Sequence, residues 1–186
     1  MFFALFHLPS SILHGQNARL WATYYGGAAD EFGYGTATDA SGNVYLAGNT
    51  KSVSGIASGG FQNAFAGNQD AFLVKFDAAG NRLWATYYGG ANWEYCNGVA
   101  TDAAGNVYLT GATSSTSGIA SGGFQNAFGG GSFDAFLVKF DGAGNRIWAT
   151  YYGGPTGTDW GYRVSTDAAS KVYLAGMTES ASGIAS

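Results

Sequence analysis

The phrase LWATYYGG occupies residues 20–27 and returns at residues 83–90, and the similar phrase IWATYYGG occupies residues 147–154. The copies begin 63 and 64 residues apart. A fixed period of this length indicates stacked supersecondary units, none of which can bury its own apolar surface alone. We therefore treat the chain as a repeat protein.

The composition of the 186-residue chain fits short strands joined by tight turns. Aromatic residues make up 16% of the chain and charged residues 11%, and 31 glycines accompany 2 prolines. Such a chain favours strands and turns. No window keeps apolar residues at the i, i+3, i+4 and i+7 spacing of a helix over several turns, and apolar residues are too abundant for a disordered chain.

Each period holds four strand candidates, which in the first period are residues 35–39, 43–48, 71–77 and 82–88. Both faces of the last two candidates are largely apolar, a pattern typical of a sheet that other sheets cover on both sides. Four antiparallel strands per unit, repeated around an axis, are the plan of a β-propeller. The sequence therefore predicts an all-β fold made of propeller blades, each about 63–65 residues long, with a β-solenoid as the alternative.

Short hairpin turns that begin with Asp connect these candidates. They read DASGN at 39–43, DAAGN at 77–81 and 102–106, and DGAGN at 141–145. Asp accepts hydrogen bonds from the following backbone, while Gly and Asn tolerate a positive φ. The corresponding DAASK at 167–171 has Ser and Lys in place of Gly and Asn, so we expect a more strained or looser turn there.

The repeat divides the chain into an N-terminal segment, residues 1–16, and a repeat region, residues 17–186. The repeat region holds a lone fourth strand at residues 20–25, units at about 28–90 and 91–154, and an incomplete unit at 155–186. Propellers typically close with four to eight blades, and an open arc leaves an unpaired strand edge at each end. We therefore expect either a fragment of a longer protein or several chains that complete one ring or stack.

The N-terminal segment, MFFALFHLPSSILHGQ, carries no charged residue and differs in character from everything that follows. Its apolar run is too short to span a bilayer. It is similar to the hydrophobic part of a secretory signal whose basic start is missing. We expect a truncated signal peptide remnant. The alternative is an N-terminal strand that packs on the fold and supplies a partner for the lone fourth strand.

The linked motifs DAFLVKFD..GNRLWATYYGG and TDA.GNVYL.G.T resemble the bacterial SBBP repeat, a family named for a seven-bladed β-propeller. The resemblance covers essentially residues 17–186. The chain departs from the family pattern in the segment after YYGG. The family often has a small residue and acids there, whereas the three copies in this chain read AADEFGYG, ANWEYCNG and PTGTDWGYR. Membership in the family implies a bacterial protein that is secreted or exposed at the cell surface, and it implies no established activity.

The repeats lack the residues of common catalytic sites. Both histidines, His7 and His14, precede the repeats, which therefore contain no Ser-His-Asp or Cys-His nucleophile and no His-based zinc site. No basic cluster suits nucleic acid in a chain whose net charge is −4. The single cysteine, Cys96, has no disulfide partner, and we expect it to fill space rather than to react. We expect no enzyme activity, no required cofactor and no transmembrane segment.

Carboxylates are the recurring ionisable candidates, and the first set of them opens the hairpin turns. These residues are Asp39, Asp77, Asp102, Asp141 and Asp167. We expect them to accept hydrogen bonds within the turns. Calcium is the alternative, because oxygen-rich Asp/Asn turns bind it, although the spacing lacks a DxDxDG-type cluster of ligands.

A second set pairs an acid with an aromatic residue in the connection between successive blades. The pairs are Glu31–Phe32, Glu94–Tyr95 and Asp159–Trp160. Such connections gather at one face of a propeller, and an acid beside an exposed aromatic suits a sugar, which stacks on the ring and donates its hydroxyl hydrogens to the acid. These six residues are the candidate ligand-binding residues. The alternative is that each aromatic packs between blades while the acid accepts backbone hydrogen bonds.

These observations predict a non-catalytic, secreted propeller that serves as a scaffold or a multivalent binding surface for a polysaccharide or a protein. Repeated weak sites gain through avidity. One alternative is a structural protein whose chains pair edge to edge into a homo-oligomeric ring, fibre or surface layer. Another is a polysaccharide-cleaving enzyme, but a glycosidase needs two carboxylates at a defined separation, and near-identical units show no specialised pair.

Overall fold

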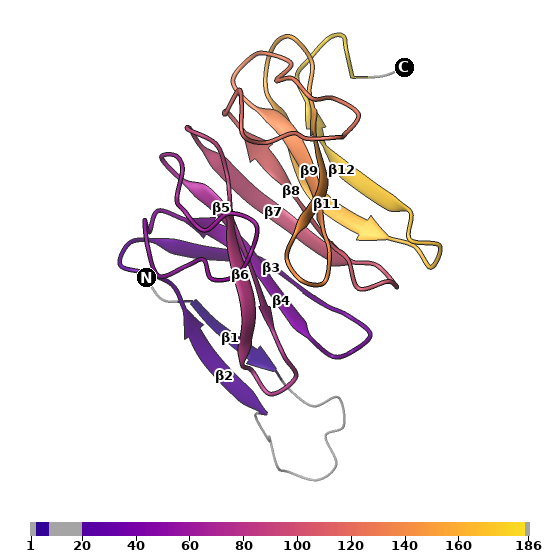
Figure 1. Ribbon diagram of the computed structural model, residues 1–186. Coiled ribbons are helices and arrows are strands. Elements are labelled where there is room, and N and C mark those ends of the chain that lie inside the picture. The colour runs from indigo at the N-terminus through magenta and orange to yellow at the C-terminus, as the bar shows by residue number, and fades with distance from the viewer. Residues whose placement is uncertain (1–2, 8–19, 185–186) are drawn as a thin grey trace.

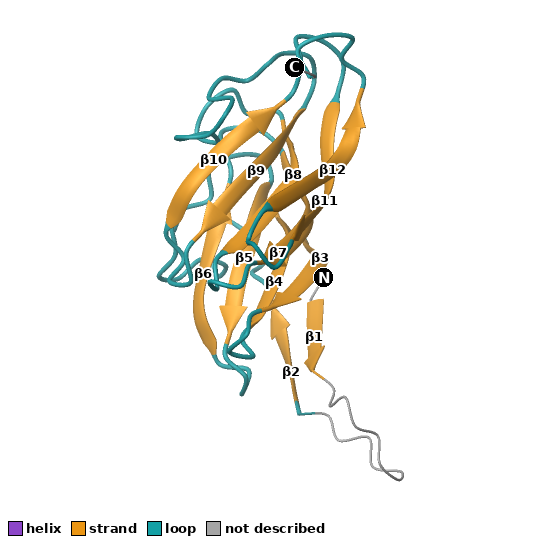
Figure 2. Ribbon diagram, turned by 90° about the vertical axis from the view of Figure 1, so that its right-hand side faces the viewer, coloured by secondary structure: helices purple, strands orange, loops and turns teal. Residues whose placement is uncertain are grey.

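The computed structural model describes residues 3–7 and 20–184, and these residues form β-strands and no helix (Figure 2). The strands are β1 (Phe3–His7), β2 (Trp21–Tyr25), β3 (Glu31–Thr38), β4 (Val44–Thr50), β5 (Asp70–Phe76), β6 (Arg82–Tyr88), β7 (Glu94–Thr101), β8 (Val107–Thr113), β9 (Asp134–Phe140), β10 (Arg146–Tyr152), β11 (Asp159–Thr166) and β12 (Val172–Thr178). Within the described part of the chain, no helix is long and apolar enough to cross a membrane.

The strands form two complete blades and two half-blades. The complete blades are four-stranded antiparallel sheets in the orders β3-β4-β5-β6 and β7-β8-β9-β10, and the half-blades are the pairs β1-β2 and β11-β12. Figure 1 shows the sheets stacked face to face in chain order, from the indigo β1-β2 pair to the yellow β11-β12 pair. The predicted all-β fold of four-stranded antiparallel units is confirmed.

The first strands of successive blades lie closest to one another. β7 contacts both β3 and β11, whereas the fourth strands β6 and β10 make no extensive contact with each other. Hydrogen bonds also link the first strands, because Thr101 Oγ1 donates to Thr38 O at 2.6 Å and Thr166 Oγ1 donates to Thr101 O at 2.7 Å. Sheets that meet along their first strands and diverge toward their fourth strands fan about an axis, as the blades of a propeller do. The described residues form an arc of such a fan.

The first strand of each blade is longer than the sequence predicts. β3 begins at Glu31 rather than at Gly35, and its register against β4 shifts between Gly33 and Gly35. The corresponding register shifts occur in β7 and in β11. A bulge places an extra residue in one strand and breaks the alternation of inward and outward side chains. The sequence pattern therefore ends at the bulge although the strand continues through it.

The hairpin turns confirm the structural role predicted for their aspartates. Oδ1 of Asp39 accepts hydrogen bonds from the backbone N–H groups of Ser41 and Asn43, each at 3.0 Å. The same two bonds recur at Asp77, Asp102, Asp141 and Asp167. In the deviant turn Ser170 has a φ of 60°, where the other turns place glycine. A side chain in this left-handed region costs about 1–2 kcal/mol, so the expected strain is confirmed.

Aromatic side chains pack one blade against the next. Tyr88, at the end of β6, lies 5.3 Å from Phe136 and 5.9 Å from Phe140 between ring centroids, and its hydroxyl donates to Ile119 O at 2.9 Å. The corresponding residues of the preceding junction are Tyr25, Phe72, Phe76 and Ile56. Tyr25 and Tyr88 therefore each insert between the third strand of the next blade and the loop that joins its second and third strands, residues 51–69 in one blade and 114–133 in the other.

The segment Phe3–His7 forms β1 and pairs antiparallel with β2. Phe3 lies opposite Tyr25 in this pair, just as Ala71 lies opposite Tyr88 in the pair of β5 and β6. β1 thus takes the register position of a third strand. Residues 1–2 and 8–16 of the proposed leader lie outside the described residues, and the leader remains a prediction.

Candidate functional site

The three acid–aromatic pairs open the first strand of each blade. Glu31–Phe32 begins β3, Glu94–Tyr95 begins β7 and Asp159–Trp160 begins β11. The sequence placed these pairs in loops between blades, and this is wrong, because Glu31, Glu94 and Asp159 already pair with residues of the second strand. The bulge in each first strand hides this extension in the sequence.

The acid of each pair is buried and hydrogen-bonded. Glu94 is 0% exposed, and its Oε1 accepts from Thr113 Oγ1 at 2.6 Å while its Oε2 accepts from the N–H of Gly90 at 2.9 Å. Burial raises the pKa of Glu94 above its usual value. Glu31 makes the same two bonds with Thr50 and Gly27.

Asp159 repeats this arrangement with a shorter side chain. Its Oδ2 accepts from the N–H of Gly154 at 2.9 Å and from Ser180 Oγ at 3.0 Å. Like the two glutamates, it fastens the YYGG turn of one blade to the strand that follows. Because neighbouring residues of a strand point to opposite faces, the acid and the aromatic of a pair do not line one surface. The carboxylates are therefore placed to hold the fold rather than to meet a surface ligand.

The aromatic members of two pairs gather with three further rings at one place. The Tyr95 ring lies 5.3 Å from Trp160 and 5.7 Å from Phe133 between centroids, and Phe133 lies 5.6 Å from Trp160. Trp93 stacks on Tyr95 at 6.3 Å, and Tyr162 lies 6.3 Å from Trp160. We call these five residues the aromatic patch. Trp93 is 37% exposed and Tyr162 42% exposed, so the patch reaches the surface across the junction of two blades.

The corresponding aromatic residues of the first blade, Phe32 and Tyr34, do not belong to the aromatic patch. Phe32 lies 6.5 Å from Tyr34, and both rings are exposed. A cation borders the aromatic patch on this side, because Lys51 Nζ lies 5.9 Å from the Trp93 ring. The patch therefore presents ring faces, ring edges and one ammonium group.

Sequence reasoning missed Trp93, Phe133 and Tyr162. Each stands where another copy of the repeat has a different kind of residue: Trp93 aligns with Asp30 and Phe133 with Gln69. A comparison of the copies position by position, with attention to aromatic residues that appear in one copy alone, is the signal that would have found Trp93 and Phe133; Tyr162 has an aromatic counterpart in Tyr34 and gives no such signal.

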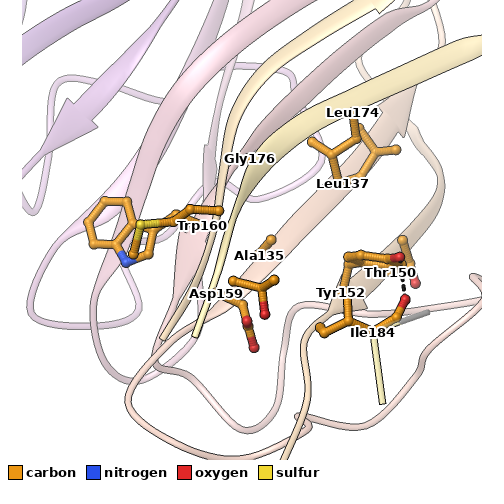
Figure 3. A pocket seen from close by; sticks show the side chains of 11 residues that line it. Ala135, Leu137, Thr150, Tyr152, Asp159, Trp160, Leu174, Gly176 and Ile184 are labelled. Atoms are coloured by element: carbon orange, nitrogen blue, oxygen red, sulfur yellow. Dashed lines mark hydrogen bonds between the residues drawn. The ribbon is translucent and has the colours of Figure 1, made fainter. Parts of the chain in front are cut away.

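A cavity of about 420 Å³ lies beside the patch, between β9 and β10 of one blade and the β11-β12 pair. Its lining is mostly apolar and includes Leu137, Tyr152 and Leu174. Figure 3 shows the Trp160 indole directed away from these side chains, and the Tyr152 hydroxyl bonded to the carbonyl oxygen of Ile184. Tyr152 corresponds to Tyr88, so the cavity occupies the place that Phe136 and Phe140 fill at the complete junction.

Other chemistry in the described residues is sparse. Among them no group of three or more His, Cys, Asp or Glu side chains is arranged to hold a metal ion. Cys96 is fully buried, and burial raises the pKa of its thiol to about 12, which confirms the prediction that it fills space. These observations do not test the prediction that the protein requires no cofactor, and that prediction stays as it was.

Comparison with known proteins identifies the repeat. The sequence model of the SBBP β-propeller repeat matches the chain at residues 20–54, 83–119 and 147–183. Each match begins in or just before the fourth strand of one blade and ends beyond the second strand of the next. An uncharacterized WD repeat-containing protein of Acanthamoeba polyphaga mimivirus is 32% identical over 90 residues, which are 45% of this chain and 6% of the relative. The matched region is thus a small part of that relative.

Proposed function

Because the chain belongs to the SBBP β-propeller repeat family, we propose that it is a non-catalytic binding scaffold whose aromatic patch contacts the ligand. The observation that carries this proposal is the convergence of five rings across one blade junction, with Trp93 and Tyr162 exposed. Aromatic faces bury large areas at little conformational cost and stack on the apolar faces of sugar rings. A polysaccharide is the ligand that this surface suits best, and a protein is the alternative partner.

The proposal differs from the sequence-based hypothesis in the role of the acids. Glu31, Glu94 and Asp159 hold strands together, so the aromatic members, Tyr95 and Trp160, supply the contact. Affinity at one patch of this kind is modest, and repeated copies along a polysaccharide would raise it through avidity. Secretion or display at the cell surface accords with this ligand, and the uncharged apolar segment 1–16 supports it.

Removal of either Trp160 or Tyr95 from the aromatic patch is expected to weaken polysaccharide binding strongly. In a glycan array and in titration of the 186-residue chain with the best polysaccharide, Trp160→Ala and Tyr95→Ala should each weaken binding about tenfold, the effect of about 1.4 kcal/mol lost from stacking. The array is run with and without CaCl₂, since calcium is the one cofactor that the turn composition suggested.

Leu83→Ala is the control, because Leu83 is 52% exposed and lies on a fourth strand, outside the patch. It should bind as the parent does. If no polysaccharide binds, or if Trp160→Ala changes thermal stability alone, the aromatic patch is not a sugar-binding surface.

Assembly of chains by strand pairing is the second candidate function. β4 and β8 pair on both edges, whereas β12 pairs with β11 alone among the described strands. The cavity beside Tyr152 adjoins that free edge. Free edges promote pairing between chains, and a third strand of the β5 or β9 type, whatever its source, would both extend the sheet and fill the cavity.

Light scattering of the 186-residue chain over a range of concentrations tests this second function. Self-assembly predicts a molar mass that rises with concentration, and a charge placed in the cavity by Tyr152→Arg should return the chain to the mass of a monomer. A monomeric mass at every concentration would count against assembly and leave the binding function untouched.

A further inference from the structure

Acidic side chains from neighbouring blades pair at two junctions, of which the first lies between the two complete blades and the second between the β7-β10 blade and the β11-β12 half-blade. At the first junction Asp70 opens β5 of one blade and Glu94 opens β7 of the next. At the second junction the acids are Asp134 of β9 and Asp159 of β11. All four side chains are at most 1% exposed. We call each pair an acid clasp.

A glycine brings the two carboxyl groups of the first clasp together. A Cβ atom on Gly89 would lie 2.5 Å from Asp70 Oδ1 and 2.5 Å from Glu94 Oε2. The two oxygens therefore border one small space, and no side chain separates them there. At the second junction a Cβ atom on Gly153 would meet Asp134 alone, at Oδ1, Cγ and Cβ, so the likeness to the first clasp rests on the burial of both acids and on their unpaired Oδ1 atoms.

One oxygen of the first clasp has no hydrogen-bond partner. Asp70 Oδ2 accepts from the N–H of Ala66 at 3.0 Å and from Gln62 Nε2 at 3.2 Å, whereas Oδ1 is buried and unpaired. Oδ1 of Asp134 and Oδ1 of Asp159 are unpaired as well. Buried polar atoms rarely remain unpaired, because burial removes their hydrogen bonds to water and an unpaired atom gains none in return. Each junction therefore holds a buried carboxyl oxygen that no N–H or O–H group of the described residues reaches.

Among the described residues no ion pair involves an acid of either clasp. The ion pairs within the described residues join Lys51 to Asp30, Lys75 to Asp39 and Lys139 to Asp102. The other titratable groups that face the clasps are tyrosines: Tyr87 near Asp70, Tyr88 near Glu94, and Tyr151 near Glu94 and Asp134. Arg146 lies beside Tyr88, but its Nη1 donates to Ile119 O. Two ionised carboxylates in such a space would repel each other.

We propose that each acid clasp is closed by one shared proton. In the first clasp Asp70 carries the proton on Oδ1 and faces the ionised Glu94, whose Oε2 is the acceptor. In the second clasp Asp134 and Asp159 share a proton in the same manner. The proton supplies the missing hydrogen bond and leaves each junction with a single negative charge instead of two. Deprotonation opens the clasp, so the junction between blades is sensitive to pH.

The titration behaviour of the acids accords with this geometry. Burial, together with the charge of Glu94, raises the pKa of Asp70 to about 7. Burial, together with the charge of Asp159, raises the pKa of Asp134 to about 6. A carboxyl group whose pKa is higher in the folded state than in the unfolded state stabilises the fold when it is protonated. This stabilisation is complete below the pKa of the unfolded state, and it is lost as the pH rises through the pKa of the folded state. The clasps therefore weaken between about pH 4 and pH 7.

The hairpin-turn acids respond in the opposite direction. A hydrogen bond from the Asn81 side chain is the main cause that lowers the pKa of Asp77. Acids of this kind stabilise the fold above their unfolded pKa, and they lose that contribution as the pH falls through the folded pKa. The two sets of acids together predict a stability maximum in mildly acidic solution and a decline toward pH 8.

Thermal unfolding of the 186-residue chain, followed by circular dichroism from pH 4.5 to pH 9, tests the proposal without any ligand and so independently of the binding function. We expect the Tm to fall by roughly 5–10 °C between pH 5 and pH 8. In the Asp70→Asn/Asp134→Asn variant the amide nitrogen takes the place of the protonated oxygen and keeps its hydrogen at every pH. This variant should lose the slope and match or exceed the parent Tm at pH 8.

Asp77→Asn is the matched control, since Asp77 is a turn acid outside the clasps. It should lower the Tm at pH 8 and keep the parent slope. Parallel pH curves for the parent and the double variant would overturn the proposal. If CaCl₂ raises the Tm of the parent at pH 8 back to its value at pH 5, and has no such effect on the double variant, the clasp holds a cation rather than a proton. This result would also overturn the proposal.

Nuclear magnetic resonance of the parent gives a second measurement that needs no variant. The ¹³C shifts of the carboxyl carbons are followed against pH, and one carboxyl group in each clasp should titrate above about pH 5.5, well above the ordinary Asp value of about 3.9. If every carboxyl carbon titrates below about pH 5, the clasps hold no shared proton.

Discussion

Gly111→Ala is expected to destabilise the fold severely. Gly111 lies in β8, opposite Cys96, where the register of β7 begins to shift. A Cβ atom at this position would lie 1.7 Å from the carbonyl oxygen of Tyr95 and 2.7 Å from its carbonyl carbon. Both atoms belong to the backbone of the bulged strand, so no side-chain rotation relieves the contact. We expect a loss of about 4 kcal/mol or more in the free energy of unfolding.

Urea unfolding followed by tryptophan fluorescence measures this loss, together with the soluble yield. Gly142→Ala is the matched control. A Cβ atom on Gly142 would come no closer than 3.4 Å to Gly105 O, and the equivalent turn of the preceding blade already holds Ala78. This change should alter stability by about 0.5 kcal/mol or less. A Gly111→Ala protein as stable as Gly142→Ala would show that β7 does not approach β8 as described.

The second large effect is expected from removal of a tyrosine at a complete blade junction. Tyr88 is fully buried between Phe136 and Phe140 and donates a hydrogen bond to Ile119 O. Tyr88→Ala leaves a cavity of aromatic size and removes one of the two hydrogen bonds to Ile119 O, the other being donated by Arg146 Nη1. Substitutions of large buried side chains by alanine cost about 3–5 kcal/mol, and we expect a cost in that range.

The chain supplies its own comparison for this prediction. Tyr152 occupies the same repeat position and makes the same bond to a loop isoleucine, Ile184, but it is 38% exposed and borders the cavity. Tyr152→Ala should therefore cost about 1 kcal/mol or less in denaturant titrations of the same chain. Equal costs for the two variants would mean that the third strand of the next blade contributes little to the junction.

The sequence predicts much of this fold because its signals are local. The strand predicted at 82–88 has the same bounds as β6, and the turn aspartates make the hydrogen bonds expected of them. Glycine recurs at one place in the turns, and the one copy that lacks it, at Ser170, shows the expected left-handed backbone. Repetition strengthens each of these signals, because the same short sequence forms the same strand or turn in every copy.

The candidate site is harder to predict because it depends on which way side chains face. The acid–aromatic pairs were recognised, but the bulge after Glu94 and Tyr95 conceals that both belong to a strand. Only a strand places the acid in the interior and the aromatic ring at the surface. The approach of Phe133 to Trp160 joins residues from two blades, and no local pattern carries that information.

The likeness of successive junctions has a consequence for how this family changes over generations. Tyr25 and Tyr88 meet the same kinds of partner, so at both of these junctions the fourth strand of one blade fits the third strand of the next in the same way. Duplication or deletion of one in-frame stretch of the gene, 63 or 64 codons long, would leave these tyrosine contacts complementary. Blade number is thus free to vary by recombination, without a new contact having to evolve first.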